Sequence, residues 1–210
     1  VDIFKTVRQY TVSMSLKMLV TSDFHMSEDL KKAAAEEAEN GDYDLFVNLG
    51  DYMSEEYAED LFNEVEIQGV GCTGNRDMMF SSEFLDGHEV PVFNFVEAEI
   101  DEEYLLILIG GDFPEDVRQK VSDLIEEHGD SKKVIIGSHY PPHKVGDKIH
   151  SGDRIGFEQF RELIIREKPA IWMNGHVHED FGKRELLGVP VINAAADETD
   201  RSTRSVTPGR

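Results

Sequence analysis

This sequence has little of three features that would each point to a particular class of protein. Its 210 residues include one cysteine, Cys72, so an internal disulfide framework is excluded and a reducing compartment, the cytoplasm, is favoured. The most apolar run, Leu105 to Ile109, is far too short to cross a bilayer, so no membrane span is expected. Residues 1–15 mix charged with apolar side chains and lack the uninterrupted apolar stretch of a secretory signal.

Positive charge is also scarce. Lys and Arg number 21 against 43 Asp and Glu, which gives a formal net charge of -22. Broad nucleic-acid binding requires basic patches and is therefore not expected. A small phosphoester substrate stays open, because bound metal ions can dominate the field of an acidic site. Solubility is the plainer explanation of the charge. The oligomeric state also stays open, with a dimer among the options.

What the chain does contain is an alternation of short β-rich runs with helical patterns. This alternation predicts an α/β domain with a parallel sheet, and two hairpins add antiparallel strands in the second half. The spacing predicts strands at 17–21, 43–49, 67–73, 90–100, 104–109, 134–138 and 170–174, a hairpin at 182–191, and helices at about 27–39, 55–64, 114–129 and 156–168.

The length suits one domain with a sizeable core. We place that domain at residues 17–197 and interpret residues 1–16 as an N-terminal extension, with Met14 or Met18 as the natural start. Residues 198–210 show no periodicity, and we expect a tail without regular structure there.

Polar side chains of metal-ligand type follow five of the predicted strands. Because the carboxyl ends of parallel strands meet at one edge of a sheet, these side chains are expected to lie together. Imidazole, carboxylate and carbonyl oxygen together suit Mn, Fe or Zn. The candidates are Asp23, His25, Asp51, Asn75, His139, His176 and His178.

Each of these residues alone has a structural explanation. Asp23 could cap a helix, Asp51 could end a strand, and Asn75 could occupy a turn. His139, before two prolines, would more often be an ordinary loop histidine. His176 and His178 alternate at a strand end and so point to the same side. The ordered set as a whole favours a metal site.

Five short blocks carry a resemblance to a known family. The blocks are Asp23-Phe24-His25, Gly50-Asp51, Gly74-Asn75-Arg76-Asp77, Gly137-Ser138-His139 and Gly175-His176-Val177-His178. They resemble, in order, the signature blocks of calcineurin-like metallophosphoesterases. The resemblance implies a four-layer α/β/β/α sandwich of two mixed sheets, with a metal site at the carboxyl ends of the strands.

The resemblance also implies roles for the individual residues. Asp23, His25 and His178 would hold one divalent ion, and Asn75, His139 and His176 the other, with Asp51 bridging both. Mn²⁺ is the first choice, with Fe, Zn or Ni as alternatives. Two such ions would activate a shared hydroxide for attack at phosphorus, which makes the implied activity hydrolysis of phosphodiesters or phosphomonoesters. Asp51, Asn75, Arg76 and His139 are the residues assigned to catalysis.

Arg76 departs from the family pattern, because many members have histidine at this position. Arginine stays protonated and cannot act as a general acid, but it can bind a phosphate oxygen. We therefore expect a preference for phosphodiesters or good leaving groups, with Arg76 held by Asp77. The alternative is a purely structural ion pair between these two residues.

Two other interpretations are possible. Gly69 to Gly74 match the G-x-G-x-x-G string of dinucleotide-binding folds, but they overlap a predicted strand instead of opening a helix. A catalytically weak or inactive scaffold of the same fold, serving protein interaction, is the stronger rival. The intact set of seven ligand-type residues favours the enzyme.

Overall fold

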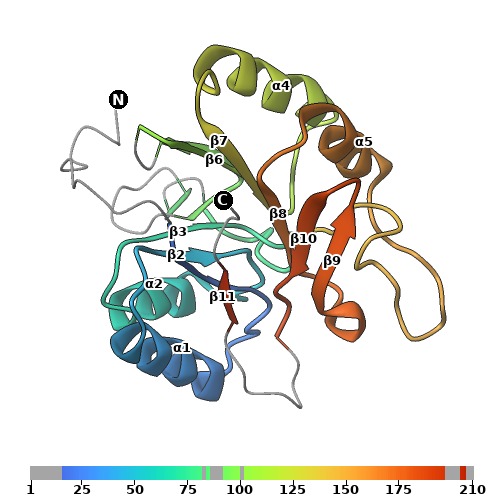
Figure 1. Cartoon of the computed structure of the whole chain (residues 1–210). Helices are drawn as coiled ribbons and strands as arrows, with labels where there is room; N and C mark the ends of the chain where they lie inside the picture. The colour runs from blue at the N-terminus through green and yellow to red at the C-terminus, as the bar shows by residue number, and fades with distance from the viewer. Residues whose placement is uncertain (1–15, 82–83, 86–91, 100–101, 197–203, 207–210) are drawn as a thin grey trace.

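A computed structural model describes residues 16–81, 84–85, 92–99, 102–196 and 204–206 of the chain. Two β-sheets pack face to face, and helices cover the outer face of each sheet (Figure 1). This arrangement is the four-layer α/β/β/α sandwich expected from the sequence.

The first sheet is built largely from the N-terminal half of the chain. Four of its strands are parallel neighbours, and the short C-terminal strand β11 pairs antiparallel with β1 at one side. The order across the sheet is β11 (Arg204–Val206), β1 (Met18–Thr21), β2 (Leu45–Asn48), β3 (Gly69–Cys72) and β4 (Val92–Phe93).

The second sheet has a parallel centre with an antiparallel strand at each edge. The order is β5 (Phe95–Glu99), β6 (Tyr104–Ile109), β7 (Lys133–Ser138), β8 (Ile171–Asn174), β10 (Val189–Asn193) and β9 (Gly182–Leu186).

Two helices of the described ranges cover each sheet. The first sheet carries α1 (Glu28–Asn40) and α2 (Glu55–Glu64), and the second carries α4 (Val117–His128) and α5 (Glu158–Glu167) (Figure 1). The Oγ atoms of Ser27 and Ser54 accept backbone N–H bonds and so cap α1 and α2. None of the helices in the described ranges has the length and apolarity that a bilayer crossing requires.

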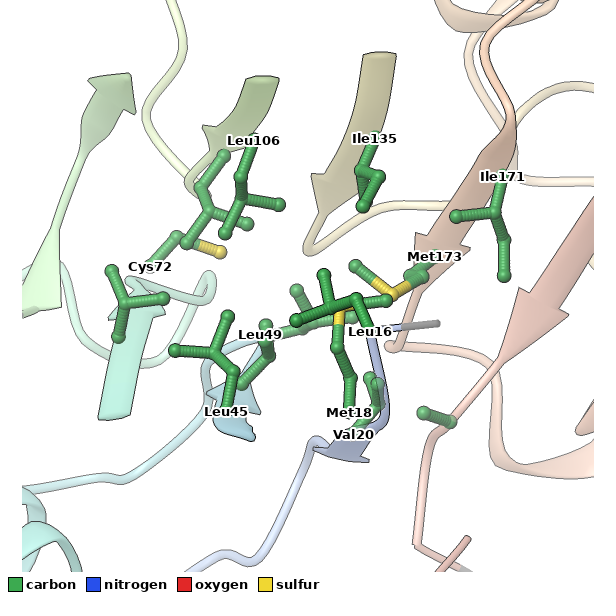
Figure 2. Packing of buried hydrophobic residues seen from close by; sticks show 14 of the residues in the cluster. Leu16, Met18, Val20, Leu45, Leu49, Cys72, Leu106, Ile135, Ile171 and Met173 are labelled. Carbon is green, nitrogen blue, oxygen red and sulfur yellow. The ribbon is translucent and has the colours of Figure 1, made fainter. Parts of the chain in front are cut away.

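The main core lies between the two sheets. Figure 2 shows Met18 and Leu45 of the first sheet facing Leu106, Ile135 and Met173 of the second. All five side chains are almost fully buried. Because parallel strands in the middle of a sandwich are covered on both faces, they are apolar throughout, as the YLLILI sequence of β6 illustrates.

The structure corrects three details of the sequence prediction. The strand predicted at 90–100 is two strands, β4 and β5, and at Asn94 the chain crosses from the first sheet to the second. The Asn94 carbonyl accepts the Gly110 N–H at 2.6 Å, which holds this crossing in place. The helix predicted to start at Pro114 begins at Val117, because the Pro114 carbonyl is used in a turn to the Val117 N–H.

The third correction concerns the C-terminal tail. Arg204–Val206 form β11, although residues 198–210 were expected to lack regular structure. An edge strand can be held by backbone pairing alone, and such pairing leaves no periodic side-chain pattern to detect. Residues 1–15 of the extension predicted at 1–16, and residues 198–203 and 207–210, lie outside the described residues.

Candidate metal centre

The seven predicted ligand residues lie at one edge of the sandwich, beyond the carboxyl ends of strands β1, β2, β3, β7 and β8. The two sheets are tied together at this edge. The Gly111 N–H, after β6, donates to the Thr73 carbonyl after β3 at 2.7 Å, and Ser22 forms a bridge with Ala195. The closing of the sandwich therefore brings side chains of both sheets into one site.

The backbone at this edge is strained. Asp23, His25, Asp51 and His176 have φ angles of 60°, 47°, 63° and 71°. Residues with a Cβ seldom adopt this left-handed conformation, and such strain is concentrated at functional sites. Four of the seven predicted ligands share it, which a purely structural turn at each position would not require.

The turns also approach one another too closely for side chains at two glycines. A Cβ on Gly74 would lie 2.2 Å from Asp51 Oδ1 and 2.8 Å from His139 Cε1. A Cβ on Gly175 would lie 2.5 Å from Asp23 Oδ2. These glycines therefore let the two sheets bring their polar side chains into contact.

Asp23 is buried and faces two histidines. Its Oδ2 accepts the His176 N–H at 2.8 Å. Its Oδ1 is buried without a hydrogen-bond partner and lies 3.7 Å from His178 Nε2 and 4.0 Å from His25 Nε2. A buried carboxylate oxygen left unpaired is costly, and a cation among these three atoms would satisfy it.

Asp51 stands between the two sheets. Its Oδ2 lies 3.1 Å from His25 Nε2, and its Oδ1 lies 3.6 Å from His139 Nε2. Oδ1 also accepts a hydrogen bond from the backbone N–H of Arg76 at 2.9 Å, which fixes the orientation of the carboxylate. One carboxylate thus reaches histidines from both halves of the site.

Asn75 and His139 face each other. His139 Nδ1 lies 2.8 Å from the Leu49 carbonyl, which can only accept, so in the neutral ring Nδ1 carries the proton. Nε2 is then an acceptor, and it lies 2.9 Å from the acceptor Asn75 Oδ1. Two facing acceptors suit a bound cation, and the carbonyl bond to Nδ1 is the kind that orients metal-ligating histidines.

Two triads of carboxylate and imidazole atoms result from this geometry. Within each, the candidate ligand atoms lie within 4.8 Å of one another. One triad is Asp23, His25 and His178, and the other is Asp23, His139 and His176. The sequence placed Asp23 with only the first group, whereas the structure brings it within reach of both.

The two C-terminal histidines of the site differ in protonation. Burial, with His139 as the second cause, lowers the pKa of His176 to about 4, so this ring is neutral at pH 7. Contact with Asp23 raises the pKa of His178. Burial alone would raise the pKa of Asp23, but the His178 and His139 rings outweigh it and the pKa of Asp23 is lowered. Asp23 is therefore an ionised carboxylate, as a metal ligand must be.

Comparison with known proteins places this arrangement in a family. The family profile described as calcineurin-like phosphoesterase matches residues 16–180, well over half of the chain. The chain belongs to the calcineurin-like phosphoesterase family. Metal-dependent phosphoester hydrolysis is the general activity that this membership supports, with divalent ions at the candidate ligands.

Solved structures agree with this calcineurin-like phosphoesterase in fold. TT1561 of Thermus thermophilus aligns with a TM-score of 0.63 at 13% identity, over 93% of this chain and 100% of that one. A dimetal phosphatase from Danio rerio aligns with a TM-score of 0.61 at 11% identity, over 89% of each chain. A novel archaeal phosphodiesterase aligns with a TM-score of 0.50 at 17% identity, over 91% and 99%. A search of curated proteins finds no match.

Arg76 of this calcineurin-like phosphoesterase lies beside Asp51. Its Nε is 3.7 Å from Asp51 Oδ2, and 55% of its side chain is exposed. The expectation that Asp77 holds Arg76 is therefore replaced by a contact with Asp51. The Arg76 side chain is therefore close to Asp51 and still partly exposed to solvent.

Asp77 has a different function, which the sequence analysis missed. Its buried carboxylate accepts the backbone N–H groups of Asp51, Gly74 and Met53 at 2.8, 2.7 and 2.9 Å. Burial raises the pKa of Asp77, against the lowering effect of these bonds. Asp77 thus joins the turn after β2 to the turn after β3, and its place in the Gly74–Asp77 block was the available signal.

An aromatic wall supports the second sheet's side of the site. The Tyr140 ring packs against His176 and His139, with ring centroids 4.7 and 5.0 Å apart. His143 lies 3.5 Å from Asp147 and 3.3 Å from Glu158, and His150 lies 3.5 Å from Glu179. These two histidines are occupied by loop contacts, whereas Tyr140 shapes the site.

The structure of residues 69–74 supports neither dinucleotide binding nor a reactive cysteine. Gly69 to Cys72 form strand β3, so this string does not open a helix. Cys72 is buried between the sheets, and burial raises the pKa of its thiol. A buried thiol of this kind is unreactive.

Proposed function

We propose that this protein hydrolyses phosphodiesters, and phosphomonoesters as a second class, at a centre of two divalent metal ions. The observation that carries the proposal is the Asp51 carboxylate, whose two oxygens face His25 and His139 from opposite sheets. The archaeal protein that is similar in fold is a phosphodiesterase, which agrees with the diester choice. We assign the activity to a domain at residues 17–197, and the lone buried Cys72 suits a cytoplasmic location.

The ligand sets follow the facing atoms described above. Asp23, His25 and His178 would hold one ion, and Asn75, His139 and His176 the other, with Asp51 between them. When bound, such a pair of ions would lower the pKa of a water molecule and supply positive charge for the phosphoryl oxygens. The unpaired Asp23 Oδ1 and the facing acceptors at His139 and Asn75 are the local features that fit this occupancy.

Arg76 would bind a phosphate oxygen. Its exposed guanidinium lies beside Asp51 and offers several N–H donors, which suits a non-bridging oxygen of the substrate. Because arginine does not release its proton, it cannot protonate the departing alkoxide. The enzyme should therefore prefer esters whose leaving groups are stable as anions.

The direct test is hydrolysis of bis(p-nitrophenyl) phosphate and p-nitrophenyl phosphate by metal-stripped protein, before and after addition of Mn²⁺. We expect turnover only with the metal and faster turnover of the diester. Asp51→Asn should lower kcat/KM by roughly a thousandfold, the upper range for loss of one charge-stabilising group. Metal binding without turnover of either ester would instead favour the inactive scaffold.

A second experiment tests Arg76 alone. Arg76→His should make kcat/KM less dependent on the leaving-group pKa across a series of aryl phosphodiesters, because histidine can donate a proton. Arg118→His is a matched control, since Arg118 is 51% exposed, pairs with Glu162 and lies on α4. An unchanged dependence in Arg76→His would show that Arg76 does not govern leaving-group preference.

A further inference from the structure

Methionines gather at the candidate site in an unusual way. Among the described residues, the methionines outside the core between the sheets all lie on the loops after β1, β2 and β3. We call these four the methionine rim: Met26, Met53, Met78 and Met79, which are 52, 39, 75 and 92% exposed. These loops are the same ones that carry Asp23, Asp51 and Asn75.

Hydrogen bonds tie the methionine rim to the ligand residues. Met26 follows His25, whose N–H donates to the Asp51 carbonyl at 3.0 Å. The Met53 N–H donates to Asp77 Oδ1 at 2.9 Å, and Met78 follows Asp77 directly. The rim therefore lies on the same hydrogen-bonded turns as the first sheet's candidate ligands.

Met78 and Met79 stand at the tip of a well-anchored turn. The Phe80 N–H donates to the Asp77 carbonyl at 2.9 Å, which makes the two methionines the central residues of the turn. Phe80 packs toward the buried Tyr52 ring, with ring centroids 6.2 Å apart, and this contact anchors the turn to the core. Turn positions of this kind favour Gly, Asn, Asp and Ser. Two thioethers this exposed gain little burial from folding.

Met26 and Met53 are equally unfavourable for folding. Their φ angles are 61° and 81°, in the left-handed region where Gly, Asn and Asp are favoured. Four apolar side chains thus occupy exposed or strained positions around one site. This pattern indicates that they contact something other than the protein's own core.

We propose that the methionine rim binds the aromatic organic group of the phosphoester, a nucleobase or another aryl group; this rests on the proposed function. Thioether sulfur makes favourable contacts with aromatic rings, and the flexible methionine side chain adapts to different ring shapes. The metal centre and Arg76 hold the phosphate, while the rim holds the ring attached to it.

The negative charge around the methionine rim favours a small phosphoester as the bound molecule over a large anionic one. Acidic residues begin the helices that follow Met26 and Met53, namely Glu28, Asp29, Glu55 and Glu56. With a net charge of -22, this surface repels anionic bilayers and polynucleotides. A single phosphoester attached to one uncharged ring meets far less repulsion.

The test compares two p-nitrophenyl esters, one of thymidine 5′-phosphate and one of methyl phosphate, with the Mn²⁺-loaded protein. The leaving group is the same, so the ratio of their kcat/KM values reports on the second substituent. Met78→Ser combined with Met79→Ser should lower the thymidine-to-methyl ratio by about tenfold, mainly through KM, for the loss of two sulfur–ring contacts. Leu187→Ser is the matched control, because Leu187 is 70% exposed at the turn between β9 and β10. This turn lies at the start of β10, at the end of the second sheet opposite to the candidate site. An unchanged ratio in the double variant, or an equal drop in the control, would overturn the proposal.

Methionine oxidation gives a readout that does not need turnover. Hydrogen peroxide should convert Met78 and Met79 to sulfoxides quickly, and the thymidine ester should slow this more than the methyl ester does. Buried Met18 and Met173 serve as internal references in the same mass spectrum. If both esters are hydrolysed but the thymidine ester does not selectively protect Met78 and Met79 from oxidation, the proposal for the methionine rim fails and the hydrolase proposal stands. If the thymidine ester protects these methionines but neither ester is hydrolysed, the hydrolase proposal fails and the rim proposal stands. Absence of both defeats the two proposals together.

Discussion

The two sheets contribute different chemistry to one site. The first sheet supplies both carboxylates, an amide and a guanidinium, on Asp23, Asp51, Asn75 and Arg76, with one imidazole, His25. The second sheet supplies imidazoles, on His139, His176 and His178. Negative charge therefore comes from one sheet, and the imidazole nitrogens among the candidate ligands come mainly from the other.

The two halves are also held in different ways. On the first sheet, the buried carboxylate of Asp77 accepts backbone N–H groups of Asp51 and Gly74 and so fixes the turns that carry the candidate ligands. On the second sheet, the Tyr140 ring packs on His176 and His139 and is itself backed by Phe157, 5.0 Å away. Neither half alone offers a complete ligand set, so closing the sandwich assembles the site.

The largest predicted effect is a pH dependence of stability in the second sheet's half of the site, in metal-free protein. The pKa of His176 is about 4, below its ordinary value of 6.5, because the ring is buried. Below pH 6.5 the unfolded chain binds a proton that the folded protein refuses, so stability falls as pH decreases from 6.5 toward 4. The loss should reach about 3 kcal/mol. His176→Gln should remove it, as measured by urea unfolding at pH 7 and pH 4.5.

His178 provides the opposite control. Asp23 raises its pKa, so its contribution to stability is fully present below pH 6.5 and is lost as pH rises through the raised value. His178→Gln should therefore act above pH 6.5, where it removes the loss of stability that follows a rise in pH, whereas His176→Gln acts below pH 6.5 and makes the acid loss shallower. If both variants change the slope in the same direction, the two histidines do not occupy the different environments described here.

A smaller effect is predicted where the halves touch. Gly74→Ala places a Cβ 2.4 Å from the Asp51 backbone nitrogen and 2.8 Å from His139 Cε1, so one side of the site must shift. Overpacking of this kind should lower the free energy of unfolding by about 2 kcal/mol. Gly188→Ala has open space around its Cβ and only left-handed strain, which costs about 1 kcal/mol. Thermal unfolding of both variants checks the order, and an equal loss would argue against tight contact at Gly74.

The sequence predicted most of the fold for identifiable reasons. Ser27 before an Ala- and Glu-rich run marked the start of α1, and its Oγ does accept the Leu30 N–H. Apolar runs such as 104–109 and 134–138 marked β6 and β7. Each ligand-type residue followed such a run, and parallel strands necessarily bring those ends together. The family profile then confirmed the resemblance.

The remaining features depend on tertiary contacts that leave no periodic pattern. The split of residues 90–100 at Asn94 follows from pairing with two different sheets, and β11 follows from backbone bonds to β1. The contacts of Asp77 follow from two turns meeting in space. Local sequence carried the ligand types, but only the closed sandwich showed that Asp51 faces histidines of both sheets.

The most direct test of the shared site is titration of Mn²⁺ into metal-stripped protein, followed by electron paramagnetic resonance and hydrolysis of bis(p-nitrophenyl) phosphate. We expect two ions per chain, magnetic coupling between them, and activity that appears as the second ion binds. Asp51→Asn should abolish the coupling. Full activity with a single bound ion, or two uncoupled ions in the unmodified protein, would contradict a dinuclear centre bridged by Asp51.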